Sequence, residues 1–442
     1  MTRVLSFKFR TVARVLLFLA LPLLFLVGCE KENKSDLKEL EFMLSGKPSE
    51  LKVLRKQIDR FEAENPGIKV HLLHVPGSGK EYEQKFLTMA AAGTPADLAM
   101  VFTMIYYTYI QRGTLLDLTS MIEEDPDFRK EDYFETNWEG LEYHGAYYGV
   151  PLMWITYVLY YNKQIFDKEG VKYPYDGMRW DEFVDVAKRL VHRDSDGRIL
   201  QYAFVWPDFY MKESLWYLLL HQNGGRALLR DGDEYVLGKE PYVRANTEAL
   251  RYFIDLSEKH HISPASYELE QFQGMDLFLE GKAAMKLSGS WEPFVFRERK
   301  FFEWGVTSLP FSTNPYTFHS STMLVVPKGA KHPKEAFKLA KYLSCGEHQN
   351  ILAETGRAIP SLISATQTDF YKKSFEVDRD IMIQVAKSGG RSGYKGKSAM
   401  YRSEIYDIEK RNLELVFLHQ ISLEEAIQRI QQRVENVLSK ER

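Results

Sequence analysis

Two short turns contain residue types that bind phosphate or calcium in other proteins. Gly77–Lys80 reads Gly-Ser-Gly-Lys, but a phosphate-binding loop also needs a glycine at the position that His74 occupies. Asp194–Gly197 begins like a calcium loop. However, Arg198 stands where the next oxygen ligand belongs, and Val205 stands where the bidentate glutamate belongs. We therefore interpret the first segment as a plain loop and the second as a polar turn between a helix and a strand.

The histidines and cysteines are not spaced for a metal site. His71 and His74 share one predicted strand and His260–His261 end a helix, and neither pair has acidic or cysteine companions at ligand spacing. Cys29 and Cys345 are the only cysteines, which excludes a disulfide framework. We expect no metal and no cofactor, and we expect Cys345 to be buried or to cap a helix.

The first 36 residues are predicted to lie outside the fold. A basic segment precedes the apolar run Val15–Val27, which is short for a membrane-spanning helix and typical of a secretory signal. Leu26–Cys29 resembles the lipobox of bacterial lipoproteins, in which the cysteine thiol is acylated. We expect residues 1–28 to be a lipoprotein signal peptide and residues 29–36 to be a polar tether. The lipidated Cys29 would anchor the protein to the outer side of the cell membrane.

Length and charge limit the architecture and the partners. The 442 residues exceed what one hydrophobic core usually supports, so two lobes or domains are expected. The formal net charge of −3 argues against nucleic acid or an anionic membrane surface as the main partner, because both attract basic proteins. The membrane is therefore expected to be contacted through the lipid anchor only.

The hydrophobic pattern after the tether alternates between the periods of a strand and of a helix. Strands are predicted at Leu40–Leu44, Ile68–Leu72 and Asp97–Val101. Helices are predicted between them, over Ser49–Phe61 and Tyr82–Met89. Alternating strands and helices predict an α/β fold with a parallel sheet.

The carboxyl ends of these strands predict one ligand-binding rim, because ligands of such sheets bind where the strand-end loops converge. Ser45–Lys47 and Phe102–Met104 follow two of the strands directly. Farther along the chain, Trp154–Tyr161 is predicted to be an apolar and aromatic strand, and Arg244–His260 a helix. Ser422–Glu425 reads as a capping box that begins the last amphipathic helix.

Seven short segments follow one another in an order that is typical of one family. In chain order they are Ala91–Leu98, Tyr148–Leu152, Leu159–Lys163, Trp180–Phe183, Gly281–Met285, Ser288–Trp291 and Gly356–Ser361. Together they resemble the family 1 extracellular solute-binding proteins, the relatives of maltose-binding protein that serve ABC sugar importers. The resemblance covers nearly the whole mature chain.

The resemblance implies a two-lobe, periplasmic-binding-protein-like (type II) fold with a central ligand cleft and hinge crossovers. The expected N-terminal lobe is residues 37–149 plus 320–371, and the expected C-terminal lobe is residues 150–319 plus 372–442. The chain is expected to cross between the lobes near Gly149–Pro151, His319–Thr322 and Phe370–Lys373. Closure around a ligand is the hinge motion of periplasmic binding proteins.

Sugars present apolar C–H faces edged with hydroxyls, so flat aromatic rings and planar polar groups suit them. The chain has 26 Tyr, 27 Phe and 7 Trp. Where the resemblance locates the cleft, we predict ligand contacts from Lys47, Phe102, Thr103, Tyr106, Trp154, Trp206, Asp208, Ser290, Trp291, Glu292 and Tyr401. Trp291 matches a family position that commonly stacks on the sugar. The alternative for each tryptophan is a place in the core.

Other residues near these positions are assigned different roles. Tyr160–Tyr161 are expected to be structural, and Arg357 is expected to form an ion pair within one lobe. Met104–Ile105 stand where the maltose-binding relative carries charged groups for sugar hydroxyls, so maltose itself is not the expected ligand. Lys47 or Arg402 would instead admit an acidic sugar such as a uronate.

The resemblance implies a monomeric, non-enzymatic substrate-binding component that delivers a sugar or short oligosaccharide to the transmembrane subunits of an ABC permease. One alternative keeps the binding fold but presents the ligand to a membrane signalling protein. A second alternative is a surface carbohydrate-active hydrolase. That activity would need two converging carboxylates, for which Glu292 and Asp208 are the candidates.

Overall fold

The structure of the chain is a computed structural model. It describes residues 37–440 apart from residues 78, 207–214, 230–231, 266–267, 269–271, 273–274, 300–301, 374–376, 378 and 392–393. The predicted signal peptide, tether and lipidated Cys29 lie outside the described residues, and so does Asp208.

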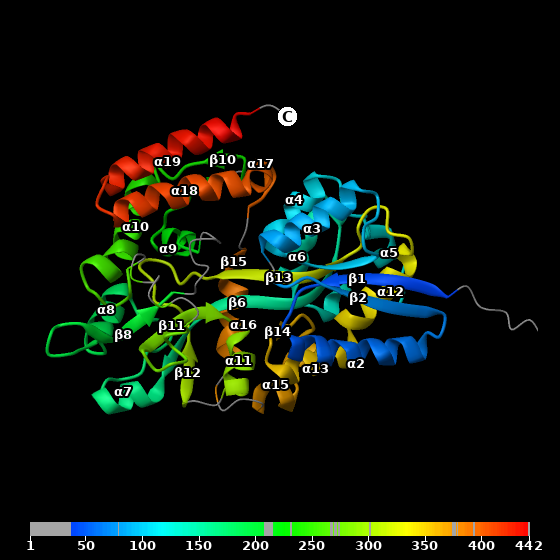
Figure 1. Cartoon of the computed structure of the whole chain (residues 1–442), viewed down its shortest axis with the longest axis horizontal. Coiled ribbons are helices and arrows are strands. Elements are labelled where there is room, and N and C mark those ends of the chain that lie inside the picture. Colours follow the sequence, from blue (N-terminus) through cyan, green and yellow to red (C-terminus); the bar gives the residue numbers. More distant parts are fainter. Residues whose placement is uncertain are drawn as a thin grey trace, which may run out of the picture.

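The amino-terminal strands are parallel, as the alternating pattern predicts. β1 (Lys38–Leu44) lies between β2 (Ile68–His74) and β3 (Leu98–Phe102) and is parallel to both. The connecting helices are α2 (Pro48–Glu64) and α3 (Lys80–Ala91). In Figure 1, α2 lies on one side of these strands and α3 lies on the other. The predicted elements of this region are confirmed to within a few residues.

One long strand connects the two parts of the sheet. β6 (Val150–Asn162) extends the strand predicted at Trp154–Tyr161 in both directions. The sheet has the order β2-β1-β3-β13-β6-β11-β8-β7, and β12 and β14 also pair with β6. The other strands of the sheet are β7 (His192–Arg193), β8 (Ile199–Val205), β11 (Ala283–Gly289), β12 (Trp304–Thr307), β13 (Phe318–Val325), β14 (Ile359–Pro360) and β15 (Gly390–Arg391).

β6 changes partners at its middle. Thr156 is still opposite His319 of β13, whereas the next residue, Tyr157, is opposite Gly289 of β11. Figure 1 shows β6 and β13 crossing the centre of the molecule, with β1 and β2 to one side and β8, β11 and β12 to the other. The middle of β6 is therefore where the two parts of the molecule meet.

Helices cover both parts of this sheet (Figure 1). The remaining helices are α4 (Thr103–Gln111), α5 (Thr119–Glu123), α6 (Glu135–Leu141), α7 (Lys163–Glu169), α8 (Trp180–Lys188), α9 (Tyr217–Gln222), α10 (Val243–Glu258), α11 (Glu292–Arg299), α12 (Pro333–Ser344), α13 (Gly346–Thr355), α14 (Ile363–Thr366), α15 (Asp369–Lys373), α16 (Asp380–Ser388), α17 (Gly396–Met400), α18 (Arg402–Phe417) and α19 (Leu423–Leu438). Two small hairpins are β4 (Glu142–Tyr143) with β5 (Ala146–Tyr147), and β9 (Leu228–Leu229) with β10 (Glu234–Tyr235). Within the described part of the chain, no helix has the length and apolar character needed to cross a membrane.

Local capping explains where the last helix begins. The Ser422 side chain accepts a hydrogen bond from the backbone N–H of Glu425 at 3.1 Å, which satisfies one of the free donors of the first turn of α19. The predicted start of this helix is confirmed. Cys345 is half-buried and is both the C-cap residue of α12 and the N-cap residue of α13, a helix-end position as predicted, although its side chain makes no capping hydrogen bond.

Successive side chains of β6 enter two different hydrophobic clusters, because neighbouring residues of a strand point to opposite faces. Trp154, Val158 and Tyr160 belong to one cluster, which also contains residues of α11 and α16. Tyr157 and Leu159 belong to the other, larger cluster. The face of the strand on which a residue lies therefore decides its neighbours.

Candidate ligand site at the middle of the sheet

Strand ends from the two parts of the sheet converge on the middle of β6. Phe102, the last residue of β3, is opposite Thr322, which is in turn opposite Met153 of β6. On the other part, Gly289, the last residue of β11, is opposite Tyr157. Met153 and Tyr157 are four residues apart, which corresponds to about 13 Å along a strand. The loops that follow β3 and β11 thus begin close to the same region.

Trp291 is a partly exposed ring at the end of β11. Its ring meets the ring of Tyr157 at a centroid distance of 5.8 Å and an interplanar angle of 86°. It also lies against the backbone of Gly289, where an added Cβ would be 1.9 Å from the ring. The absence of a side chain at Gly289 makes room for the indole, so Trp291 has a defined position with one part facing solvent.

Trp206 lies on the same face of the sheet as Trp291. It follows β8 directly, is partly exposed, and makes edge contacts with Phe204 and Phe253 at 5.3 and 5.2 Å. With Leu159 and Leu287 it lines a small apolar cavity of about 20 Å³, which is too small for a sugar. The two tryptophans therefore belong to one aromatic face, and any ligand would contact their exposed edges.

Lys47 and Phe102 are the accessible predicted residues of the β1 side. Phe102 is partly exposed. Lys47 is exposed at the start of α2, and its backbone N–H donates to the Glu50 carboxylate at 3.0 Å. Glu50 also pairs with Arg357 at 3.1 Å, so the predicted role of Arg357 as an ion-pair partner is confirmed. Lys47 is thus an exposed basic residue at the start of α2.

Tyr401 lies where α17 ends and α18 begins, and it is partly exposed. Its ring lies 5.7 Å from Lys440 Nζ. The neighbouring Arg402 forms a 2.7 Å ion pair with Glu83 of α3, and both side chains are mostly buried. Because this guanidinium is already held by a carboxylate, Arg402 is not available to an acidic sugar in this structure.

Contacts between α17 and α4 accompany this ion pair. The hydroxyl of Thr108 donates to the carbonyl of Ala399 at 2.8 Å, and the Gln111 amide donates to the carbonyl of Gly396 at 2.6 Å. Tyr401 is thus carried by a segment that touches the helix that begins immediately after Phe102.

Trp154 is fully buried and faces away from Trp291. Its ring packs against Phe134 at 4.7 Å and approaches His319 at 6.0 Å. The reason is strand alternation: Trp154 and Tyr157 are three residues apart, so their side chains leave β6 on opposite faces. Trp154 offers no surface to a ligand in this structure, and its predicted contact is replaced by the core role.

Tyr106 and Thr103 also have internal partners. Tyr106 is 0 % exposed, donates to the carbonyl of Leu141 at 2.7 Å and accepts from the backbone N–H of Tyr148 at 3.1 Å. Burial raises the pKa of this phenol well above its ordinary value. Thr103 exchanges two 2.8 Å hydrogen bonds with the backbone of Ser321. Thr103 thus joins α4 to β13, whereas Tyr106 joins α4 to the end of α6 and to the segment before β6. Neither side chain is presented to a ligand here.

Ser290 and Glu292 flank Trp291 but are themselves buried. The backbone N–H of Ser290 donates to the carbonyl of Thr156 at 2.9 Å. The Glu292 carboxylate pairs with Lys286 at 2.8 Å. Their predicted ligand contacts are therefore replaced by contacts that fix the turn around Trp291.

The metal-like motifs form ordinary turns and strands, and Ser78 of the phosphate-like segment lies outside the described residues. The Asp194 carboxylate accepts hydrogen bonds from the backbone N–H groups of Asp196 and Arg198, as in a polar turn. His74 Nε2 lies 3.0 Å from the carbonyl of Gly46. The described residues contain no group of three His, Cys, Asp or Glu side chains that could hold a metal ion.

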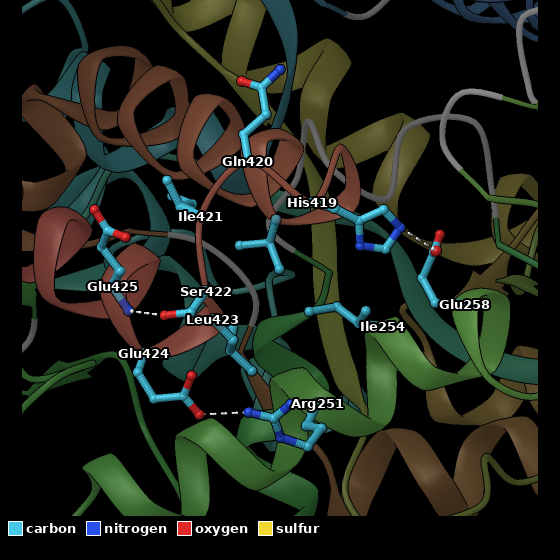
Figure 2. A pocket seen from close by; sticks show the side chains of 11 residues that line it. Arg251, Ile254, Glu258, His419, Gln420, Ile421, Ser422, Leu423, Glu424 and Glu425 are labelled. Carbon is cyan, nitrogen blue, oxygen red and sulfur yellow. Dashed lines mark hydrogen bonds and ion pairs between the residues drawn. The ribbon is translucent and has the colours of Figure 1, made fainter.

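A larger recess lies elsewhere, between α10 and the junction of α18 and α19 (Figure 2). It has a volume of about 530 Å³ and is lined by Arg251, Ile254, Glu258, Val416, His419, Gln420, Ile421, Ser422, Leu423, Glu424 and Glu425. Arg251 pairs with Glu424 and His419 pairs with Glu258 (Figure 2). None of the predicted ligand residues lines it, and it has no Trp, Tyr or Phe ring for a sugar face.

Comparison with known proteins identifies the family. The family model described as bacterial extracellular solute-binding protein matches residues 47–344, which is more than half of the chain. The chain belongs to this solute-binding protein family. The family predicted from the sequence is thereby confirmed.

The relatives of this solute-binding protein have low sequence identity to it, but the similarity extends over most of the chain. A binding protein of Brucella abortus is 26% identical over 321 residues, covering 70% of this chain and 73% of the relative. The multiple sugar-binding protein of Streptococcus mutans is 25% identical over 336 residues, covering 72% of this chain and 75% of the relative.

Solved structures share the fold of this solute-binding protein. An ABC substrate-binding protein from Listeria monocytogenes, in complex with cycloalternan, superposes with a TM-score of 0.81 at 23% identity, covering 92% of this chain and 100% of that chain. The maltose-bound MalE3 of T. maritima gives a TM-score of 0.74 at 22% identity, covering 90% and 99%. The predicted two-lobe α/β fold is confirmed.

The sequence missed Tyr157 and Gly289 as parts of the site. Alternation from any one known residue of β6 assigns the face of Tyr157, and alternation along β11 does the same for Gly289. What was lacking was the knowledge of which face carries the site.

Proposed function

We propose that this solute-binding protein is the substrate-binding component of an ABC importer. It binds a sugar or short oligosaccharide between its two lobes and delivers it to the permease. The observation that carries the proposal is the partly exposed Trp291, set edge-on against Tyr157 at the middle of β6. Flat rings with a solvent-facing surface suit the apolar faces of a sugar.

The proposed ligand site, here called the central site, consists of Lys47, Phe102, Trp206, Trp291 and Tyr401. These are the predicted ligand residues that keep accessible surface in the structure. The first two come from the β1 side, and the other three from the β11 side and the carboxyl-terminal helices. A ligand that contacts both lobes binds the closed arrangement more tightly than the open one. It therefore shifts the equilibrium between the two toward the closed arrangement.

The lobes expected from the sequence are residues 37–149 with 320–371 and residues 150–319 with 372–442. The strand pairing favours moving the first boundary into β6, because this strand pairs with β13 from Val150 to Thr156. The change of partners along β6 between Thr156 and Tyr157 supports a hinge there, since each half of the strand belongs to a different set of strands. The start of β13 lies beside the same point. Hinges of binding proteins are short segments of this kind.

The charge around the central site favours a neutral sugar. Arg402 is occupied by Glu83, which leaves Lys47 as the basic group of the proposed site. An exposed lysine is strongly hydrated and can hydrogen-bond hydroxyls as well as carboxylates. A uronate therefore remains an outcome of the screen below, with Lys47 as its partner.

The protein is proposed to have no catalytic activity. A sugar hydrolase needs two carboxylates on either side of the scissile bond. Glu292 is buried in contact with Lys286 and cannot serve as one of them in this structure. Lipidation of Cys29 would hold the binding protein near its permease on the outer side of the membrane. The alternative in which the ligand is presented to a membrane sensor uses the same central site.

A thermal-shift screen followed by calorimetry tests the proposal. The panel contains maltotriose, cycloalternan, diacetylchitobiose, mannobiose, tagatose and a uronate. We expect at least one sugar to bind with an affinity on the order of micromolar, equivalent to roughly −8 kcal/mol.

Trp291→Ala should reduce the shift, because its dissociation constant is expected to rise about 30-fold. Trp138→Phe should keep the shift, because the Trp138 ring packs against Phe128 and Tyr133, neither of which belongs to the central site. Folded wild-type protein that no panel sugar stabilises, or a sugar that Trp291→Ala binds equally well, contradicts the proposal. Cleavage of a panel sugar by the purified protein would establish the hydrolase instead.

A further inference from the structure

A buried charged network lies directly behind Trp291. Glu292, the first residue of α11, is 4 % exposed, and Lys286 of β11 is 7 % exposed. Lys286 Nζ contacts Glu292 Oε1 at 2.8 Å and Asp276 Oδ2 at 2.6 Å. The Ser288 hydroxyl donates to the same Glu292 oxygen at 2.7 Å. The network joins the first turn of α11 to the preceding strand.

The network is charged despite its burial. Burial alone would lower the pKa of Lys286, but the attraction of Glu292 and Asp276 outweighs it and raises the pKa above its ordinary value. A charged hydrogen bond in a dry site is short and directional. Glu292 is therefore held in one place by the ammonium and the hydroxyl together.

The residues before Trp291 are fixed as well. The Tyr160 hydroxyl donates to the carbonyl of Gly289 at 3.0 Å. The backbone N–H of Ser290 donates to the carbonyl of Thr156 at 2.9 Å. Trp291 thus stands between two anchored neighbours, Ser290 on one side and Glu292 on the other.

The ring and the network leave β11 on opposite faces. Lys286 and Ser288 are two residues apart and share one face, whereas Gly289 is on the other, the face against which the Trp291 ring lies. The charged groups therefore cannot contact a ligand that stacks on the ring. They fix the backbone from behind.

We propose that the buried Lys286–Glu292 pair positions Trp291, so that its ring is fixed over Gly289 before any sugar arrives. This inference rests on the proposed function, because it takes Trp291 as the stacking surface. A ring that is already ordered loses less conformational freedom on binding, and affinity rises accordingly. Glu292 and Lys286 are positioning residues in this scheme, and neither touches the ligand.

The double variant Lys286→Met/Glu292→Leu removes the two buried charges and keeps similar volume. The third charged group, Asp276, has a side chain that is 29% exposed, so water can solvate it once the lysine is gone. Replacing a whole buried pair by apolar side chains is often neutral for stability, whereas removing one partner leaves a buried charge. We expect the double variant to fold with a melting temperature close to wild type. Its dissociation constant for the panel sugar that binds wild type best should rise about three- to ten-fold. Lys341→Met, which breaks the ion pair with Asp125 in the other part of the molecule, should leave this constant unchanged.

A cycle with Trp291→Ala separates positioning from general stabilisation. If the pair acts through the ring, adding the two substitutions to Trp291→Ala causes no further loss of sugar affinity. An equal loss in both backgrounds, or unchanged affinity of the double variant in the wild-type background, overturns the inference.

A ligand-free measurement keeps this test independent of the proposed function. With 5-fluorotryptophan labelling, the ¹⁹F resonance of Trp291 is assigned by its disappearance in Trp291→Phe. We expect one sharp resonance in the wild type and a shifted, broadened or divided one in the double variant, without any sugar. An unchanged resonance overturns the positioning role. Failure of wild type to bind any panel sugar overturns only the proposed function.

Discussion

The ring of Trp291 meets the ring of Tyr157 edge to face, with centroids 5.8 Å apart. One residue follows the end of β11 and the other lies at the middle of β6, where that strand changes partners. This pair joins the aromatic surface proposed for the ligand to the strand proposed as the hinge. We therefore expect movement of either part of the sheet to displace the Trp291 ring.

The first prediction concerns this pair. Trp291→Ala should raise the dissociation constant of the panel sugar about 30-fold, as expected for a central aromatic contact. Tyr157→Phe keeps the ring and its edge contact, so it should bind almost as well as wild type. Isothermal titration calorimetry measures both dissociation constants. An equal loss of sugar affinity in the two variants would contradict the proposal that Trp291 stacks on the sugar.

A second prediction concerns Gly289→Ala. The added Cβ would lie 1.9 Å from the Trp291 ring, so the ring must move. We expect weaker sugar binding together with a loss of roughly 1–3 kcal/mol in the free energy of unfolding, the usual cost of overpacking. Gly67→Ala is the control, because nothing lies within 4 Å of its Cβ position. Urea unfolding measures the free energy of unfolding, and calorimetric titration measures sugar binding. If Gly289→Ala and Gly67→Ala give the same values, the prediction is wrong.

A third prediction concerns the Arg402–Glu83 ion pair, which joins α18 to α3. If these helices belong to different lobes as proposed, the pair favours the closed arrangement without a ligand. Arg402→Met should then increase the radius of gyration of the ligand-free protein in small-angle X-ray scattering and weaken sugar binding. Arg244→Met removes an exposed pair within α10 and serves as the control. Identical scattering of both variants would refute the lobe assignment of these helices.

A fourth prediction concerns pH. Burial lowers the pKa of His348 to about 4, and the nearby Arg60 adds to this effect while Glu347 opposes it. The unfolded chain takes up this proton near pH 6.5, but the folded protein resists protonation until about pH 4, so stability is lost as pH falls through this window.

Between pH 7 and pH 5 the loss from this one group is on the order of 2 kcal/mol. Urea unfolding at the two pH values measures it, and His348→Gln should show a smaller difference. His221→Gln is a second comparison, because burial lowers the pKa of His221 to about 4 in the same way. No change in the pH dependence for either variant would contradict the assignment.

A fifth prediction concerns Cys29. Cys29→Ser removes the thiol that the lipobox would present for acylation. Expressed in a bacterial host, the wild type should fractionate with membranes and incorporate labelled palmitate, whereas the variant should do neither. Cys345→Ser, a change at the half-buried second cysteine, should leave both properties intact. Membrane association of Cys29→Ser would exclude this anchor.

The fold was predictable because its elements follow local rules. Alternating apolar residues at Leu40–Leu44 and the helical period that follows require a strand and a helix whatever the rest of the chain does. The order of family segments then implied the two-lobe arrangement, which the family match and the similar structures confirm.

The site was only partly predictable, because accessibility is a property of packing. Sequence alone selected Trp291 and Trp154 on similar grounds, yet one is partly exposed and the other fully buried. Glu292 was predicted to contact the ligand, but in the structure its carboxylate forms an ion pair with Lys286.

The sequence by itself therefore determined the α/β architecture, the family and the aromatic residues from which the proposed site was chosen. Only the tertiary structure decided which rings face solvent and which charges are already paired. The physical reason is that strand and helix periods depend on neighbouring residues, whereas burial depends on segments that are distant in the chain. Arg402 and Glu83, which are 319 positions apart, form such a contact, and no local pattern specifies it.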